Sequence, residues 1–400
     1  MAAGPDLRIS WDALLAGRVG LTGDGLAEVM AASNAPGVIS FAGGFPNAET
    51  FPWEALPEAL AGIVAARDAT AFQYPPVPGL DSTRDYLRGR VEQLDGRRPA
   101  EDELMLTSGG IEALECVGKV FLEPGDLVLV ESPTYLGAIM GFHNYGARLE
   151  LVELDDQGLR VDALEGLLAG GARPKLLYTI PDHQNPAGVS LAPERREAVV
   201  ALARRYGFLV VEDVAYRELR FDGDPDPSLW SRGPDVVLQL GTFSKTLFPG
   251  ARLGWAVGPA EVVAHLAWAK QTSDQGAGAL AQRLCEELGR SGALDAQIER
   301  SRALYRRRWQ LTRASFEAHL AGEAVWTEPT GGFLTWLTLT GEGDSTELAR
   351  RSFAAGVAFV PGRPFFADGR GARHLRLAFS LPDEQRIDEG IERLAAVIRG

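Results

Sequence analysis

Cysteine and basic charge are both scarce in this sequence, and each scarcity excludes a class of protein. Cys116 and Cys285 are the only cysteines. They are too few and too far apart for a disulfide framework or a metal site, so we expect reduced thiols in a cytoplasmic protein. The formal net charge is -14, whereas a protein that binds nucleic acid usually shows a basic surface.

Long apolar runs are absent as well. No stretch reaches the length of a membrane span, and residues 1–11 lack the basic start and apolar core of a signal peptide. We therefore expect neither nucleic acid nor a membrane as a partner. The length of 400 residues exceeds one ordinary hydrophobic core and predicts two domains.

Lysine is rare too. Of 40 basic residues only Lys119, Lys175, Lys245 and Lys270 are lysines. Lys119 and Lys270 lie in expected helices, and Lys175 precedes an expected strand. Only Lys245 lies where a strand meets a turn. A solvated loop lysine is the common alternative for any single lysine, so the neighbours of Lys245 decide its interpretation.

Lys245 stands among residues that suit a phosphate group. An apolar strand at 236–240 is followed by Thr242 and Ser244, and Arg252 comes seven positions after the lysine. Hydroxyls and a guanidinium bind phosphate, and a deprotonated lysine amine forms a Schiff base with an aldehyde. Pyridoxal phosphate carries both groups, so this segment predicts a site for that cofactor.

The surrounding pattern alternates strands with helices from residue 103 onward, which predicts an α/β domain. Several strands are apolar on both faces, as in a mostly parallel sheet that helices cover on both sides. Ligands bind beyond the carboxyl ends of such strands. The expected strands are 104–107, 127–131, 148–154, 176–180, 208–212, 236–240 and 253–257.

Candidate ligand groups follow these strands. Gly109 and Gly110 precede an expected helix at 111–121, and free N–H groups at a helix N-terminus bind anions. Tyr135 follows the next strand, where it either packs in the core or stacks on a flat ring. Asn185 supplies an amide that donates to a phenolate or carboxylate, although Asn-Pro also starts turns for local reasons.

Charged side chains complete this set. Asp213 ends an apolar strand, where a carboxylate is costly unless it meets a cation such as a protonated pyridine nitrogen. A helix cap or a surface turn is the alternative. Arg376 lies inside an apolar strand, either in a structural ion pair or as a clamp for a substrate carboxylate. His183 is either a general base or, more commonly for such a residue, polar loop content.

Further elements are expected outside the alternating region. A short strand starts at Val38 and breaks at Gly43 and Gly44, which form a turn or allow close approach of a ligand. Tyr74 lies in a rigid, proline-rich loop. The other expected helices are 25–33, 53–67, 80–93, 259–288, 294–320 and 383–398, and the other expected strands are 332–339, 357–360 and 375–379.

Four motifs together indicate a family. They are Gln-Asn-Pro-Ala-Gly at 184–188, Val-Val-Glu-Asp-Val-Ala-Tyr-Arg-Glu-Leu at 210–219, Phe-Ser-Lys-Thr-Leu-Phe-Pro-Gly-Ala-Arg at 243–252 and Phe-Val-Pro-Gly at 359–362. As a set they resemble the fold type I pyridoxal-phosphate enzymes of the class I/II aminotransferase family, most of all the 2-aminoadipate and aromatic aminotransferase group. The resemblance covers most of the chain.

The resemblance implies roles residue by residue. Lys245 would form the internal aldimine and move the substrate proton. The implied cofactor ligands are Gly109, Gly110, Ile111, Tyr135, Asn185, Asp213, Tyr216, Thr242, Ser244, Lys245 and Arg252, with Tyr74 from a partner subunit. The implied substrate ligands are Gly43, Gly44, Asn185 and Arg376. No metal is implied.

The resemblance also implies an architecture and an activity. The fold would be α/β, with a large domain built on a mostly parallel seven-stranded sheet and a smaller α+β domain. Residues 1–50 would form an N-terminal arm and part of the small domain, 51–290 the large domain and 291–400 the small domain. A homodimer with shared sites would move an amino group from an L-amino acid to a 2-oxo acid through an external aldimine and a ketimine.

Several positions depart from the family pattern. Ala187 replaces a threonine, Gly110-Ile111-Glu112 replaces Ser-Gln-Gln, and Ala27 stands where relatives with dicarboxylic substrates place an arginine. Two alternatives to amino transfer therefore stay open. One is a pyridoxal-phosphate enzyme of specialised metabolism that catalyses β- or γ-elimination, replacement or cyclisation. The other is a regulator that binds ligands without turnover, which the acidic chain and the missing helix-turn-helix domain disfavour.

Overall fold

A large mixed sheet forms the centre of the computed structural model, which describes residues 11–19 and 35–400. Its strand order is β2-β9-β8-β7-β6-β3-β4-β5. Neighbours from β8 to β4 pair in parallel, whereas β2–β9, β8–β9 and β4–β5 are antiparallel. The strands are β2 Leu104–Thr107, β3 Leu127–Ser132, β4 Arg148–Asp155, β5 Gly158–Leu159, β6 Leu176–Thr179, β7 Leu209–Asp213, β8 Val237–Thr242 and β9 Gly254–Val257.

The expected α/β fold is confirmed. All seven predicted strands are present, and the two-residue strand β5 extends the sheet at one edge. The predicted helix at 25–33 and Ala27 lie outside the described residues.

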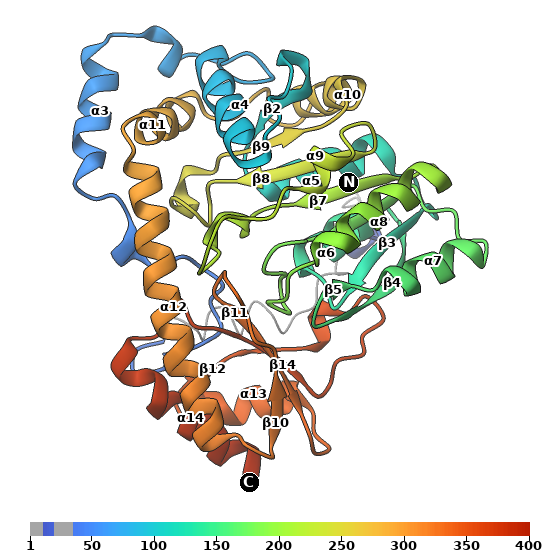
Figure 1. The fold of residues 1–400 in the computed structure, drawn as a ribbon, viewed down its shortest axis with the longest axis vertical. Helices are drawn as coiled ribbons and strands as arrows, with labels where there is room; N and C mark the ends of the chain where they lie inside the picture. Colours follow the sequence, from blue (N-terminus) through green and yellow to red (C-terminus); the bar gives the residue numbers. More distant parts are fainter. Residues whose placement is uncertain (1–10, 20–34) are drawn as a thin grey trace, which may run out of the picture.

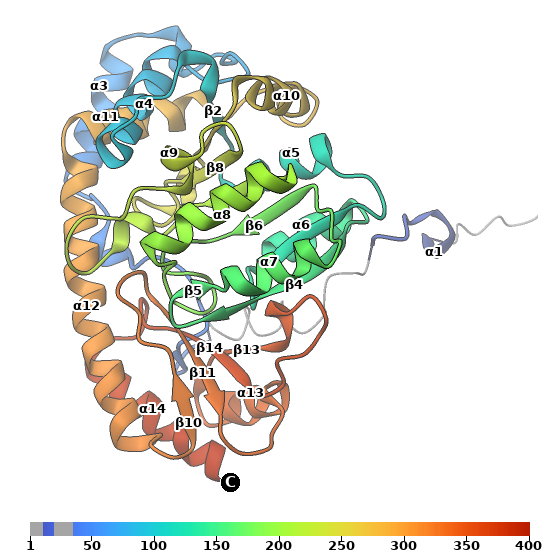
Figure 2. The same ribbon diagram turned by 45° about the vertical axis from the view of Figure 1, so that its right-hand side comes forward.

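Helices cover both faces of this sheet. Alternate residues of β3 show this: Val128 and Val130 pack with α5 and α6, whereas Leu127 and Leu129 pack with α7 and α8. Figure 2 shows α7 and α8 crossing one face. The helices of this part are α3 Ala55–Ala65, α4 Asp81–Asp95, α5 Gly110–Phe121, α6 Leu136–Asn144, α7 Val161–Ala169, α8 Pro193–Tyr206, α9 Leu229–Arg232, α10 Ala260–Gln271 and α11 Ala279–Arg290; a short helix, α1, spans Trp11–Leu14.

A second sheet gathers the C-terminal residues. It is antiparallel, in the order β10-β11-β14-β13, and the long helix α12 runs along the molecule from the large sheet to this one (Figure 1). The N-terminal strand β1 pairs in parallel with β12, so the segment near residue 40 joins the C-terminal part. The elements are β1 Ile39–Ser40, α12 Ala293–His319, β10 Ala324–Trp326, β11 Leu334–Leu339, α13 Ser345–Ala354, β12 Val357–Ala358, β13 Val360–Pro361, β14 His374–Ala378 and α14 Glu384–Arg399. The domain boundaries stay a prediction, which the β1–β12 pairing supports.

The predicted single helix at 259–288 is wrong. The chain forms α10 and α11 with a turn between them, in which the N–H groups of Ser273, Asp274 and Gln275 all donate to the Lys270 carbonyl. Gln275 (φ 64°) and Gly276 (φ 140°) then reverse the chain with positive φ angles, which a continuous helix cannot contain.

Two smaller differences concern the C-terminal part. The expected strand at 357–360 is divided into β12 and β13, which pair with different partners. The pattern also gave no sign of β10 or α13. Among the described residues, no helix is both long and apolar enough to cross a membrane.

Candidate active site

A cavity of about 470 Å³ gathers residues from Gly44 to Arg376 at the carboxyl ends of β7 and β8. Twelve of the predicted site residues line it: Gly44, Gly110, Ile111, Tyr135, Asn185, Asp213, Tyr216, Thr242, Ser244, Lys245, Arg252 and Arg376. The segments that the sequence marked separately, just after successive strands, therefore meet in one place.

Lys245 lies in this cavity just beyond the end of β8. Its Nζ donates to the Gly44 carbonyl oxygen at 3.0 Å and lies 5.8 Å from the centre of the Tyr216 ring. Burial, together with Arg376 and Arg252, lowers the pKa of Lys245 to about 8, and Asp213 acts in the opposite direction. A lysine amine with a pKa of about 8 is partly deprotonated in neutral solution, so it can act as a nucleophile and as a base.

Asp213 ends β7 and presents a carboxylate to the cavity. The Tyr178 hydroxyl donates to its Oδ2 at 2.9 Å, and the Ala215 N–H donates to its Oδ1 at 3.1 Å. Burial raises its pKa, which these hydrogen bonds and Lys245 partly offset. Among the described residues no cation lies within 4.0 Å of this carboxylate, so its charge is without an ion-pair partner.

Arg376 lies in β14 and brings the opposite charge. It is 8 % exposed. One guanidinium nitrogen donates to Asn185 Oδ1 at 3.2 Å and another to the Ala42 carbonyl at 2.8 Å. In the described part of the chain its Nε has no partner, and no carboxylate lies within 4.0 Å. A buried guanidinium without a counter-ion is costly, and a carboxylate ligand would satisfy it.

Asn185 and Tyr216 lie next to each other beside Arg376. Both are buried, at 5 % and 4 % exposure. Burial raises the pKa of Tyr216 well above its usual value, and Arg376 and the Asn185 side chain act in the opposite direction. The hydroxyl therefore stays protonated and is available as a donor.

The hydroxyls and Arg252 form another side of the cavity. Thr242 Oγ1 donates to Ser244 Oγ at 3.0 Å. Arg252 is exposed and donates to the Ser108 carbonyl at 3.3 Å. Gly109 caps α5 with a φ of 96°, and a Cβ there would lie 2.9 Å from Arg252 Nη2. A larger residue would fit neither this backbone angle nor this space.

Three predicted residues do not line the cavity: Gly43, Gly109 and Tyr74. Gly109 lies beside it against Arg252. Gly43 faces elsewhere, because a Cβ there would meet Leu381 at 2.7 Å, whereas one at Gly44 would lie 3.5 Å from Arg376. The Tyr74 side chain is 81 % exposed, which leaves it free for a partner subunit.

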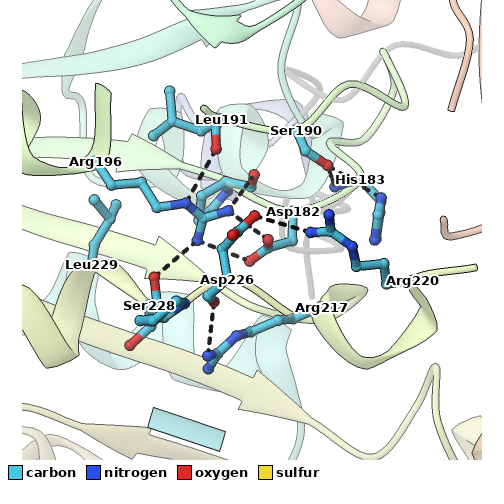
Figure 3. Close-up of polar contacts among 12 residues, drawn as sticks. Asp182, His183, Ser190, Leu191, Arg196, Arg217, Arg220, Asp226, Ser228 and Leu229 are labelled. Atoms are coloured by element: carbon cyan, nitrogen blue, oxygen red, sulfur yellow. Dashed lines mark hydrogen bonds and ion pairs between the residues drawn. The ribbon is translucent and has the colours of Figure 1, made fainter. Parts of the chain in front are cut away.

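His183 does not line the cavity either, and its side chain lies against Gly331 and Gly332. Its Nδ1 is 3.2 Å from Ser190 Oγ, and burial lowers its pKa to about 4, so the ring is neutral. Figure 3 shows it beside a set of ion pairs that brace this loop, in which Arg196 meets Asp182 at 2.6 Å and Arg220 meets Asp226 at 2.9 Å. This placement favours the structural interpretation of His183.

Sequence reasoning missed several residues at the cavity. Tyr178 holds Asp213, and its position at the end of β6, beside the strand that carries Asp213, was an available signal. The apolar residues that line the cavity could not be recognised from the sequence, because they come from four separate segments. They include Phe45, Leu136, Met140, Ala215 and Phe365.

The donor set fits pyridoxal phosphate. The Asp213 carboxylate, which has no ion-pair partner in the described part of the chain, suits a protonated ring nitrogen. Two hydroxyls, a guanidinium and the N-terminus of α5 suit a phosphate. The Lys245 amine suits an aldehyde, and Arg376 remains for a second anion.

Comparison with known proteins decides the family. A family model described as aminotransferase class I and II matches residues 37–394. The chain belongs to this family. It is a pyridoxal-phosphate-dependent aminotransferase, and the resemblance inferred from the four motifs is confirmed.

Three similar proteins illustrate the relationship. The 2-aminoadipate transaminase of Thermus thermophilus is 38 % identical over 94 % of each chain. The aromatic-amino-acid aminotransferase 1 of Thermococcus litoralis is 35 % identical over 95 % of this chain and 93 % of that one. The solved structure of an α-aminoadipate aminotransferase from Thermus thermophilus, complexed with N-(5'-phosphopyridoxyl)-L-leucine, has a TM-score of 0.91 at 36 % identity and covers 98 % of this chain and 99 % of that one.

These comparisons support amino-group transfer in the aminotransferase. They give no support to elimination, replacement or cyclisation, the first alternative that the sequence left open.

Proposed function

We propose that this aminotransferase takes its amino group from an L-amino acid with an apolar or aromatic side chain, and that Lys245 is its catalytic residue. One observation carries the proposal: a single cavity contains Asp213 and Arg376, neither of which has an ion-pair partner among the described residues, and a lysine whose pKa is about 8. The first charge suits the cofactor ring and the second suits a substrate α-carboxylate.

The chain's own groups would hold the cofactor. When bound, pyridoxal phosphate supplies an aldehyde that condenses with amines and a ring that accepts electrons from the substrate Cα. Asp213 would keep the ring nitrogen protonated. Asn185 and Tyr216 would donate to the ring oxygen, and Tyr135 would lie against the ring. The phosphate would be bound by the backbone of Gly109, Gly110 and Ile111 and by Thr242, Ser244 and Arg252.

Lys245 would perform two tasks at one atom, its Nζ. It would hold the cofactor aldehyde until a substrate amine replaces it. The freed amine would then take up and return the proton of the substrate Cα. With a pKa of about 8, roughly a quarter of free amines are deprotonated at pH 7.5, so a proton can move in either direction.

The walls of the cavity favour an apolar side chain. Phe45 and Ile111 are 40 % and 48 % exposed at its lining, and Met140 and Phe365 add further apolar surface. Among the described lining residues the only cations are Lys245, Arg252 and Arg376, each already assigned a role. Residues 20–34, which include Ala27, contain no lysine or arginine. A second substrate carboxylate would therefore lack a dedicated partner from these residues.

The donor half-reaction tests this proposal without a choice of acceptor. The cofactor-loaded enzyme is mixed with phenylalanine, leucine, alanine, aspartate or 2-aminoadipate, and oxo-acid release is followed by mass spectrometry. We expect kcat/KM for phenylalanine and leucine to exceed that for the dicarboxylic donors by about tenfold or more. A preference for dicarboxylic donors would contradict the substrate class, and no release from any donor would contradict the proposed roles.

A pair of matched variants sharpens the test. Phe45→Ala should lower kcat/KM for phenylalanine by about tenfold and leave alanine unchanged, because only the larger side chain contacts the missing ring. Phe353→Ala removes an equally exposed ring, at 39 %, from α13, and should change neither value. Equal effects of the two variants would refute the role of Phe45.

We also propose a homodimer in which Tyr74 binds the phosphate of the partner's site. Its exposure of 81 % supports this. Sedimentation should give twice the monomer mass. Mixed dimers of Lys245→Ala and Tyr74→Ala subunits should regain activity, since one of their two sites keeps both residues; no regain would contradict shared sites. A cytoplasmic location stays a prediction, supported by the two unpaired, buried cysteines.

A further inference from the structure

The first turn of α5 contains an acid where the proposed function needs an anion site. Glu112 is the third residue of α5, and its Oε2 accepts the Ser108 N–H at 3.0 Å. Gly110 and Ile111, which precede it, line the cavity. A carboxylate in this turn competes with a phosphate for the partial positive charge of the helix N-terminus and repels it.

A fully buried lysine lies directly under this turn. Lys270, in the last turn of α10, has a side chain that is 0 % exposed. Its Nζ lies 3.2 Å from Glu112 Oε2 and 2.8 Å from Asp274 Oδ2. Lysine is almost never buried unless it is paired, and here one amine is shared by two acids from different elements.

Ser108 links this cluster to the rest of the phosphate region. Its Oγ donates to Asp274 Oδ2 at 2.5 Å and lies 3.3 Å from Lys270 Nζ. Its carbonyl accepts from Arg252. Burial acts to raise the pKa of Asp274, but hydrogen bonds from Lys270 and Ser108 outweigh it and lower the pKa, so the carboxylate is ionised.

The same cluster reaches the loop that contains Tyr74. Asp274 Oδ1 accepts the N–H of Gly276 at 3.0 Å. A Cβ on Gly276 would lie 3.0 Å from Pro75 Cγ, so the turn packs closely against the residue after Tyr74. Lys270 therefore holds together α5, the α10–α11 turn and, through that turn, this loop.

We propose that Lys270 is a positioning residue for the cofactor phosphate, because it offsets the negative charge of the two acids behind the N-terminus of α5 and fixes Ser108 between them. This inference rests on the proposed placement of the phosphate at that helix. Glu112 and Asp274 bring two negative charges, and Lys270 is the only cation within 4.0 Å of both in the described residues. Without the lysine the phosphate would face two uncompensated acids.

A comparison of how tightly pyridoxal phosphate and pyridoxal bind isolates the contribution of the phosphate group. Dissociation constants of both aldehydes are measured on cofactor-free protein by absorbance, since pyridoxal shares the ring but lacks the phosphate. Lys270→Met should raise the dissociation constant of pyridoxal phosphate by about tenfold or more and change that of pyridoxal by less than about twofold. Glu112→Gln keeps an acceptor for Ser108 but loses the charge, and should tighten pyridoxal phosphate several-fold by the same reasoning.

Lys119→Met is the matched control. Lys119 also joins α5 to the end of α10, but its Nζ contacts Ala269, Thr272 and Ser273 and no carboxylate of the described residues. It should leave the ratio of the two dissociation constants unchanged.

The outcomes separate this inference from the proposed function. If the unaltered protein binds neither aldehyde, the proposed function fails. If it prefers pyridoxal phosphate but Lys270→Met weakens both aldehydes equally, Lys270 is only structural and the inference is overturned. If Lys270→Met does not fold, Glu112→Gln decides. The quantity compared is the dissociation constant of pyridoxal divided by that of pyridoxal phosphate. An unchanged value in Glu112→Gln overturns the inference, and a raised value supports it.

Discussion

Replacing Arg376 with glutamine removes a buried guanidinium that has no acid partner among the described residues. In the proposed complex this group makes two charge-assisted hydrogen bonds to the substrate α-carboxylate. Each is worth about 1.5–3 kcal/mol, so the loss of both raises the barrier by about 3–6 kcal/mol. We expect kcat/KM for an amino acid to fall by about 150- to 20,000-fold.

The assay compares two donors that differ by one group. The donor half-reaction is measured with an amino acid and with the amine that lacks its α-carboxylate. In Arg376→Gln, kcat/KM should fall for the amino acid but not for the amine. Arg350→Gln, which alters a surface arginine that is 75 % exposed, should change neither donor. A loss below about fivefold for the amino acid, or an equal loss for the amine, would refute the role of Arg376.

The stability of the same variant gives an independent check. An isolated buried charge costs free energy, so the cofactor-free Arg376→Gln protein should unfold at a temperature no lower than that of the parent. A fall in Tm of several degrees would show that the hydrogen bonds from Arg376 to Asn185 and to the Ala42 carbonyl outweigh the cost of its buried charge.

Three further predictions concern the other residues of the site. Asp213→Asn should lower kcat by about 100-fold or more while the cofactor stays bound, since the ring nitrogen loses its ion partner; a kcat within fivefold of the parent would contradict this. The rate at which cofactor-free protein attaches pyridoxal phosphate should rise as the pH passes about 8, the pKa of Lys245, because only the deprotonated amine reacts; a flat profile from pH 6 to 9 would exclude that pKa. His183→Asn should keep kcat/KM within about threefold of the parent value at each pH from 5 to 8, since asparagine tolerates the φ of 50° and the ring is already neutral. If the parent's activity changes with pH in this range and the change disappears in His183→Asn, a catalytic role would be restored.

The large sheet could be predicted because most of its strands are buried and largely apolar. β2, β3, β6, β8 and β9 have no exposed residue, and such runs are readable without knowledge of the fold. The chemistry was readable for a related reason. Asp213 ends β7 and Lys245 lies just beyond the end of β8, so one rule about strand ends brought them together.

The rest depended on contacts between distant segments. Lys270 was predicted only to lie in a helix, and the pattern did not show that the turn at Asp274 folds back and buries it against Glu112. The same turn ended the expected long helix, although Ser273 to Gly278 contains typical turn residues. Phe45 and Phe365 reach the cavity only because β1 pairs with β12 and the C-terminal part lies beside the large sheet.

Borohydride reduction tests the central claim, that Lys245 holds the cofactor, most directly. Reduction fixes any lysine-bound pyridoxal phosphate, and peptide mass spectrometry locates the added phosphopyridoxyl mass. The chain offers only four lysines, Lys119, Lys175, Lys245 and Lys270, so the answer is unambiguous. We predict the mass on Lys245 alone and its disappearance in Lys245→Ala. Stoichiometric label on another lysine, or an unchanged label in Lys245→Ala, would contradict the assignment.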